Sequence, residues 1–365
     1  MTAQAFDLAL APFVLESGAR LSRHVVSGWW FTEKGAPRDL PVVLVVPALT
    51  GNARVGGARG FWEPLVGTGR ALDTNRYRIL CCNLLGSCHG TTGGGDADFP
   101  RAAREHPVPV PPSADGRRSF ALPWESLPAT VTTWDQARSL SMTLDALGLQ
   151  KVHLATGGSL GGMVAMALAA EDPRIERVAP LGASAAASAW LLAWNHVARR
   201  ILVDAIGRGE PEAGLSLARQ LAMVSYRAPG SLEPAQGRSQ VQKIDWHPQA
   251  PYRIQTWLEN HGTRLAARFD PYAYFCLLGA MDHHDLERPS PTGRTLADVA
   301  ARTLVVALEN DTLFTAADAD RLTGLLRGHG VRVARDVVRS VHGHDALFLA
   351  WDEMGRVLRR ALDDA

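Results

Sequence analysis

The stretch HLATGGSLGGMVAM, residues 153–166, contains a serine in the pattern G-x-S-x-G. An apolar run precedes this serine at 152–155 and a second one follows at 162–170. A short strand, a sharp turn and a helix in this order are the setting of a nucleophile elbow, whose strained turn exposes the serine hydroxyl. The small residues around the serine indicate that strand and helix approach closely. We therefore predict that Ser159 is a nucleophile, provided that a base and a carboxylate follow it.

A serine hydroxyl needs a base that removes its proton and an acid that orients the base. In folds with a nucleophile elbow, the acid and then the histidine follow the serine along the chain. The stretch ENDTLF follows an apolar run, and we choose Asp311 in it as the orienting carboxylate, with Glu309 as its local rival. In SVHGHDALF, near the C-terminus, we choose His344 as the base, with His342 as the alternative.

Acyl transfer also needs two backbone N–H groups that stabilise the negative charge on the reacting carbonyl oxygen. One comes from the residue after the nucleophile, here Leu160, and the other from a loop after an early strand. PALTG, 47–51, is such a loop, and we expect Leu49 to supply the second N–H. The pair of histidines in DHHD, 282–285, does not indicate a metal site, because neighbouring side chains on a helix point in different directions, so we expect no metal.

These residues need a scaffold, and the apolar pattern of the chain suggests one. Apolar runs predict strands buried on both faces of a sheet at 41–46, 77–83, 152–156, 303–308 and 331–338. Helical patterns lie between them, notably at 131–147 and 315–326. Strands that alternate with helices predict an α/β fold with a mostly parallel sheet.

The alternation stops between about 185 and 296. This segment holds helix-like runs at 190–194, 213–224 and 272–281. One stretch rich in Pro, Gly and Ser, at 228–239, interrupts them. We interpret 185–296 as a helical lid inserted over the carboxyl ends of the sheet, where open α/β folds place their sites. Residues 1–184 and 297–365 would then form the core domain.

Composition narrows the class of protein. The 365 residues are 46% hydrophobic and 21% charged, which is ordinary for a soluble globular protein. A net charge of +1 with interspersed signs gives no reason to expect nucleic acid or a membrane as partner. The N-terminus lacks a signal-peptide pattern, and the longest apolar run (40–49) is too short to span a bilayer. The four cysteines show no CxxC spacing. We expect a soluble cytoplasmic protein with reduced thiols.

Longer stretches of the chain match one family in order. They are PALTGNA (47–53), GTGRALDTNRYRILCCNLLGSCHGTTG (67–93), GGSLGGM (157–163), WNHVARR (194–200), GLSLARQ (214–220), RFDPYAYFCLLGAMDHHD (268–285), ENDTLF (309–314) and GHDALF (343–348). With these stretches the sequence resembles the homoserine O-acetyltransferase family, acyltransferases of the α/β-hydrolase fold. The two longest stretches are far more specific than any serine motif.

The resemblance implies transfer of an acetyl group from acetyl-CoA to the hydroxyl of L-homoserine, a step of methionine synthesis, by a ping-pong route through acyl-Ser159. It implies that the arginine of an N-x-x-x-R segment binds the homoserine carboxylate. This is Arg199 here, with Arg200 as the alternative register. It also implies that Asp345 binds the ammonium group. No bound cofactor is implied, acetyl-CoA or succinyl-CoA being a co-substrate, and a homodimer is expected.

The sequence also departs from the family pattern. Pro47 stands where members commonly have His, and Leu160 where they have Met. A tyrosine-containing, Gly-rich segment expected after Arg199 is not evident at 207–213, and 228–239 matches nothing in the family. The lid differences leave the acyl group and the acceptor open. The alternative enzymes are a homoserine O-succinyltransferase, a serine or secondary-metabolite O-acyltransferase, and a serine hydrolase on the same fold. A non-catalytic binding protein is a further alternative, but the presence of a candidate for every member of the triad argues against it.

Overall fold

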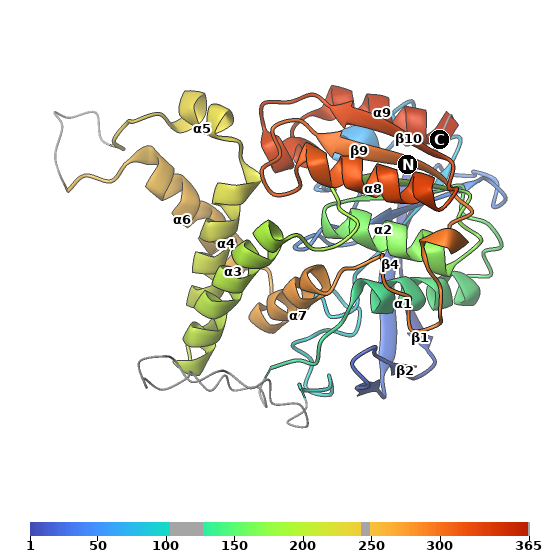
Figure 1. Ribbon diagram of the computed structural model, residues 1–365, viewed down its shortest axis with the longest axis horizontal. Coiled ribbons are helices and arrows are strands. Elements are labelled where there is room, and N and C mark those ends of the chain that lie inside the picture. The colour runs from blue at the N-terminus through green and yellow to red at the C-terminus, as the bar shows by residue number, and fades with distance from the viewer. Residues whose placement is uncertain (103–126, 242–248, 364–365) are drawn as a thin grey trace.

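An eight-stranded sheet forms the centre of the molecule. The computed structural model describes residues 1–102, 127–241 and 249–363, and its strands follow the order β1-β4-β6-β5-β7-β8-β9-β10 (Figure 1). From β6 to β10 all neighbouring strands in this order run parallel, whereas β1 and β4 are antiparallel. The strands are β1 (Thr2–Leu10), β4 (His24–Thr32), β5 (Val42–Val46), β6 (Arg78–Cys82), β7 (Leu154–Gly158), β8 (Arg177–Leu181), β9 (Arg302–Leu308) and β10 (Val333–Val338). The predicted α/β fold is confirmed.

The five strands predicted from apolar runs are β5, β6, β7, β9 and β10, and the structure adds three that the pattern did not reveal. Strand β8 contains Pro180, which breaks the pattern because proline removes a backbone donor from the ladder. Strands β1 and β4 pair along their whole length at the edge of the sheet, where six of the nine residues of β1 remain exposed. A further short pair, β2 (Phe13–Val14) and β3 (Arg20–Leu21), lies outside this sheet.

Helices cover both faces of the sheet and create two large hydrophobic clusters. Helices α1 (Thr133–Ala146), α2 (Leu160–Glu171) and α8 (Ala316–Gly328) contribute to one cluster, together with β5 and β8. Helix α9 (Trp351–Asp363) covers the other face through Met354 and Leu358, beside the buried Trp62. The carboxyl ends of the parallel strands therefore sit on a rigid three-layer base.

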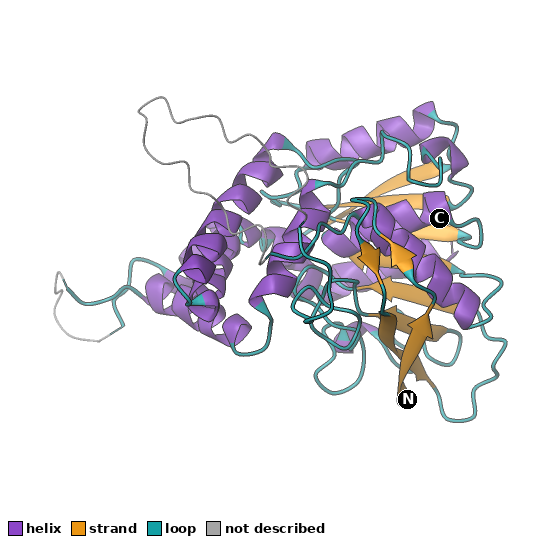
Figure 2. Ribbon diagram, turned by 90° about the horizontal axis from the view of Figure 1, so that it is seen from below, coloured by secondary structure: helices purple, strands orange, loops and turns teal. Residues whose placement is uncertain are grey.

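The segment between β8 and β9 is helical, as the sequence predicted for 185–296. It carries α3 (Ala189–Gly207), α4 (Pro211–Tyr226), α5 (Pro229–Gln236), α6 (Arg253–Ala266) and α7 (Pro271–Asp282), and we call these five helices the lid. Figure 1 shows α3 to α6 as a group set apart from the strands, whereas α7 lies closer to the core, and Figure 2 shows from a second side a group of helices that stands away from the strands. The stretch 228–239, expected to be a break between helices, instead forms the short helix α5 with Pro234 inside it. The division at 185 and 296 itself stays a prediction.

Two predictions about the chain as a whole bear on later sections. All four cysteines are free thiols, and Cys81, Cys82 and Cys276 are buried. Among the described residues, no helix combines the length and the apolar character needed to cross a bilayer.

Candidate active site

Ser159 occupies the sharp turn between β7 and α2. Its backbone has φ 58° and ψ −128°, a conformation that costs a side-chain-bearing residue about 1–3 kcal/mol. The glycines on either side allow the turn, because a Cβ on Gly157 or Gly161 would lie 2.5 or 2.2 Å from the carbonyl oxygen of Val46. The close approach of strand and helix predicted from the small residues is present, and the turn places Ser159 at the N-terminus of α2.

His344 and Asp311 form a buried hydrogen-bonded pair. Nδ1 of His344 lies 2.7 Å from Oδ2 of Asp311, and the two residues are 4% and 7% exposed. The other carboxylate oxygen of Asp311 accepts the backbone N–H groups of Leu313 at 2.8 Å and Phe314 at 3.0 Å. These bonds fix the carboxylate just beyond the end of β9, and the carboxylate in turn orients the imidazole.

The surroundings of His344 tune it as a base. Burial lowers the pKa of its imidazole, but the charge of Asp311, the hydrogen bond to it and the charge of Asp345 together raise that pKa above the ordinary value. The rings of Tyr226 and Phe314 flank the imidazole, with centroids 5.5 and 5.3 Å away. Because Nδ1 faces Asp311, Nε2 is the nitrogen that can accept a proton from a nucleophile.

The local rivals of Asp311 and His344 have other partners. Glu309 is exposed and accepts the backbone N–H of Ser340 at 3.0 Å, and His342 lies 3.5 Å from a guanidinium nitrogen of Arg227. His344, unlike His342, lines the cavity that contains Ser159. The structure thus joins the preferred acid to the preferred base.

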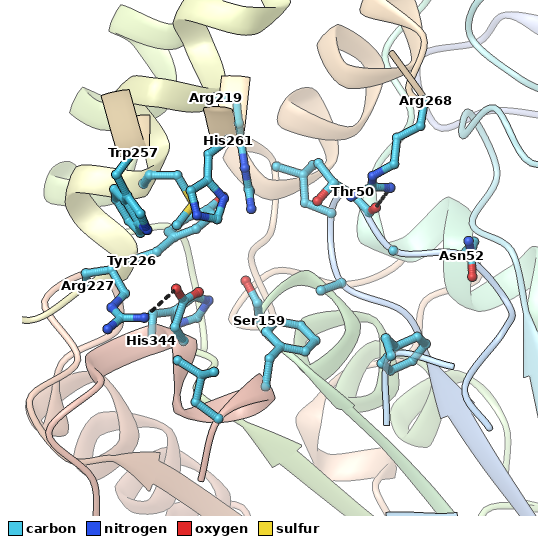
Figure 3. A pocket seen from close by; sticks show the side chains of 18 of the residues that line it. Thr50, Asn52, Ser159, Arg219, Tyr226, Arg227, Trp257, His261, Arg268 and His344 are labelled. Carbon is cyan, nitrogen blue, oxygen red and sulfur yellow. Dashed lines mark hydrogen bonds and ion pairs between the residues drawn. The ribbon is translucent and has the colours of Figure 1, made fainter. Parts of the chain in front are cut away.

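A cavity of about 640 Å³ opens between the core and the lid over Ser159. Figure 3 shows Arg219 and His261 pointing into it from the lid, opposite Ser159 and His344 of the core. The loop 48–52 forms another part of the wall, and Leu49 lies within it. Leu160 follows Ser159 as the first residue of α2, where helical N–H groups have no intrahelical acceptor. The expected oxyanion role of Leu49 and Leu160 fits these positions and stays a prediction.

The two residues predicted to hold an amino acid lie in different places. Asp345 lines the cavity next to His344. Arg199, on α3, is not among the lining residues and instead pairs with the carboxylate of Asp282, which also accepts a hydrogen bond from Asn195. The structure therefore does not bring Arg199 together with Ser159.

Arg219 is a lid cation of the cavity that no sequence pattern indicated, as are Arg227 and Arg268. It lies on α4 within the stretch GLSLARQ and lines the cavity with Ser159, His344 and Asp345. The signal that could have revealed it is its position in a stretch that already matched the family. The helical pattern of that stretch, however, does not distinguish an arginine that faces a cavity from one that faces solvent.

Asp345 lies between two opposing influences. Burial raises the pKa of its carboxyl above the ordinary value, while the charges of Arg219, His344 and Arg227 lower it. Nη1 of Arg227 lies 3.7 Å from Oδ2 of Asp345. A carboxylate in this position can bind a substrate cation, which would offset the cost of its burial.

The histidine pair at 283–284 has a structural explanation. His284 is buried between Oγ1 of Thr133 and the carbonyl oxygen of Ser184, both at 2.9 Å, and burial lowers its pKa to about 4. His283, by contrast, is exposed. Within the described ranges, no group of three or more His, Cys, Asp or Glu side chains is arranged to hold a metal ion.

The sequence and the structure of the chain are both similar to those of known proteins. A family model described as alpha/beta hydrolase fold matches residues 41–350. The homoserine O-acetyltransferase of Haloferax volcanii is 34% identical over 88% of this chain and 80% of its own. Among solved structures, homoserine O-acetyltransferase from Staphylococcus aureus has a TM-score of 0.75 at 23% identity, covering 99% of this chain and 96% of its own. An acetylester hydrolase from Corynebacterium glutamicum has the same TM-score at 16% identity, with coverage of 99% and 96%.

Proposed function

The chain belongs to the homoserine O-acetyltransferase family of α/β-hydrolase-fold acyltransferases, and from this premise we propose that it transfers an acetyl group from acetyl-CoA to the side-chain hydroxyl of L-homoserine. The observation that supports the acceptor best is the cavity itself, which presents Arg219 and Asp345 beside Ser159 and His344. One cation and one anion next to a nucleophile match the carboxylate and ammonium groups of an amino acid.

The first half-reaction would acylate Ser159. Nε2 of His344 takes the proton of the Ser159 hydroxyl while Oγ attacks the thioester carbonyl, and the Leu49 and Leu160 N–H groups stabilise the oxyanion. The carbon–sulfur bond then breaks, His344 gives its proton to the departing thiolate, and coenzyme A leaves as the free thiol. Asp311 stabilises the imidazolium that forms between the two proton transfers.

The second half-reaction would use the same groups in reverse. Nε2 of His344 takes the proton of the homoserine hydroxyl, whose oxygen attacks the acyl-serine carbonyl, and Ser159 leaves with the proton that His344 returns. The scheme balances with acyl-CoA as co-substrate and needs no bound metal or prosthetic group. The product, an O-acylated homoserine, supports a place in methionine synthesis.

We assign the homoserine carboxylate to Arg219 rather than to Arg199. Arg219 lines the cavity, whereas Arg199 lies outside it in an ion pair with Asp282. A guanidinium matches a carboxylate through two parallel hydrogen bonds, and Asp345 would receive the ammonium group. An acceptor held at both ends competes with bulk water through its effective concentration, which disfavours the hydrolase alternative.

A second candidate donor is favoured by the charges of the cavity. Among the residues that the structure describes, its lining contains four arginines, namely Arg59, Arg219, Arg227 and Arg268, and a single carboxylate residue, Asp345. Homoserine itself supplies one negative group. A donor whose acyl group ends in a carboxylate, such as succinyl-CoA, would use a further guanidinium, and Arg227 is placed for this beside Asp345.

The assembly and location that the sequence suggested remain part of the proposal. Helices α3 and α4 expose large apolar side chains, among them Trp190 at 53% and Leu217 at 51%, and these supply a face that a second copy can cover in a homodimer. Four free thiols fit a reducing compartment, so the cytoplasm is the proposed location.

Free-thiol release from acetyl-CoA and, separately, from succinyl-CoA, each with and without L-homoserine, tests the proposal. Homoserine-dependent release from acetyl-CoA is expected, and mass spectrometry of a quenched reaction without acceptor should find the acyl group on Ser159. Homoserine-dependent release from succinyl-CoA alone would select the second donor. Release that ignores homoserine would identify a hydrolase and refute the acyltransferase scheme.

A further inference from the structure

The corner between α6 and α7 contacts the loop that we expect to supply an oxyanion N–H. Arg268 lies in this corner, and its Nη1 donates a hydrogen bond to the carbonyl oxygen of Thr50 at 3.0 Å, across 218 residues of sequence (Figure 3). Thr50 follows Leu49 in the loop 48–52, which forms part of the cavity wall. The lid thus reaches the expected oxyanion loop directly.

The corner itself is fixed to the core. The backbone N–H of Asp270 donates to Sγ of Cys88 at 3.4 Å, and the ring of Phe269 meets the ring of His89 edge to face at 5.5 Å. Gly95 packs so closely that a Cβ there would lie 2.6 Å from Oδ1 of Asp270. The guanidinium of Arg268 therefore extends from an anchored backbone rather than from a freely moving lid.

The loop has a second anchor, at its far end. The side chain of Asn83, just after β6, accepts the backbone N–H of Ala53 at 2.6 Å and donates to the carbonyl oxygen of His89 at 2.7 Å. Between this anchor and β5, a turn bond from the N–H of Gly51 to the carbonyl of Ala48 at 2.9 Å gives the loop its local shape. The bond from Arg268 holds the middle of this loop.

We propose that Arg268 is a positioning residue for acyl transfer, which fixes the Thr50 carbonyl and thereby the backbone that carries the Leu49 N–H. The Thr50 carbonyl shares its peptide plane with the Gly51 N–H, which donates to the Ala48 carbonyl, and the Ala48 carbonyl in turn shares its plane with the Leu49 N–H. Arg268 acts through the loop. The inference rests on the proposed function, because it assumes that Ser159 attacks an acyl group whose oxygen the Leu49 N–H stabilises.

The rival explanation is that Arg268 binds an anionic part of a substrate, since it also lines the cavity. A neutral ester separates the two roles. p-Nitrophenyl acetate acylates an activated serine without a phosphate, a carboxylate or an amino-acid acceptor. It still needs the oxyanion hole, because its carbonyl oxygen becomes negative in the same way.

The experiment compares Arg268→Gln, Arg268→Lys and the control Arg264→Gln. Arg264 is an exposed arginine in the last turn of α6, just before the corner that carries Arg268. For each variant, the rate constant for acylation is measured with p-nitrophenyl acetate and with acyl-CoA, and thermal unfolding checks the fold. We expect R268Q to lower both rate constants by about 10- to 100-fold, the loss that a misplaced catalytic group can cause. R268K, whose longer and charged side chain can still reach the Thr50 carbonyl, should recover part of the rate that the shorter glutamine loses, and R264Q should behave as wild type.

Acylation of R268Q by the neutral ester at the wild-type rate would overturn the inference, above all if the KM for acyl-CoA or homoserine rises instead. Failure of the proposed function would look different. It would appear in the wild-type protein, which would then release nitrophenol without acylating Ser159, or at the same rate as Ser159→Ala.

Discussion

Replacing Asp311 by Asn tests how the buried pair creates a base. Oδ1 of Asp311 accepts two backbone N–H groups, from Leu313 and Phe314, while Oδ2 faces Nδ1 of His344. An asparagine keeps the two backbone bonds only if its carbonyl oxygen takes the place of Oδ1. Its NH2 group then faces Nδ1 and forces the imidazole proton onto Nε2, so His344 cannot accept a proton from Ser159.

The expected loss follows from this tautomer change. The equivalent substitution in a serine protease triad lowers kcat by about 10⁴-fold, which corresponds to about 5 kcal/mol of transition-state stabilisation. We expect D311N to lose activity on that scale while the fold persists, because both backbone bonds to Leu313 and Phe314 remain. The matched control is Glu309→Gln, since Glu309 is the neighbouring exposed acid and accepts only a backbone N–H from Ser340. This variant should stay within about twofold of wild type.

The pH dependence supplies a second readout. His344 must be neutral to act as a base, so in the wild-type enzyme the rate falls as pH drops through a pKa that lies above the ordinary value. D311N removes the charge and the hydrogen bond that raise this pKa, whereas burial, which lowers it, remains. The residual activity of D311N should therefore persist to lower pH than that of wild type. An E309Q loss equal to that of D311N, or an acid limb that moves to higher pH, would refute the reasoning.

Three further predictions follow from the same structure. Ser159→Gly should abolish acylation yet raise the free energy of unfolding by about 1 kcal/mol, because glycine relieves the backbone strain at φ 58°. An unchanged or lower midpoint in a thermal unfolding scan would contradict this prediction. Asp345→Ala should impair the use of homoserine more than the acylation of Ser159; equal losses in the two half-reactions, measured by rapid quench, would make Asp345 a support for His344. Gly161→Ala should yield little soluble protein, since its Cβ would lie 2.2 Å from the Val46 carbonyl oxygen, and a normal yield with an unchanged melting temperature would show that β5 can move away.

Local patterns were enough to predict much of the fold. Strands β5, β7 and β9 are buried on both faces, so they appear as continuous apolar runs, and the acid follows β9. The histidine follows β10, a partly buried edge strand whose valines still mark it in the sequence. Strand β8 could not be found in this way because Pro180 interrupts it. Strand β1 is an exposed edge strand that pairs with β4, and polar residues interrupt the apolar residues in both segments, so neither forms a continuous apolar run.

The lid shows where such patterns stop being informative. Arg199 was chosen for its place in a matching segment, but Asp282, which comes 83 residues later, folds back onto it. Arg219 was overlooked because a cation on an amphipathic helix is usually solvated. Which face of α4 turns to the cavity is decided by packing against α3 and α6, and no local spacing encodes that choice.

The two ends of the lid meet each other beside the core. Ala186 and Asp285 form an isolated antiparallel bridge, and the backbone N–H of Leu286 donates to the carbonyl oxygen of Ala185 at 2.9 Å. For the sheet, an insertion whose ends are this close is equivalent to a short loop, so its internal sequence does not disturb the strand order or the chain positions of Ser159, Asp311 and His344. Recombination can therefore replace the whole lid as one cassette while Ser159, Asp311 and His344 stay on the unchanged host. Grafting the lid of a relative between Ala186 and Asp285 is consequently a route by which this scaffold can acquire a new acceptor, provided that the graft keeps the bond from Arg268 to the Thr50 carbonyl.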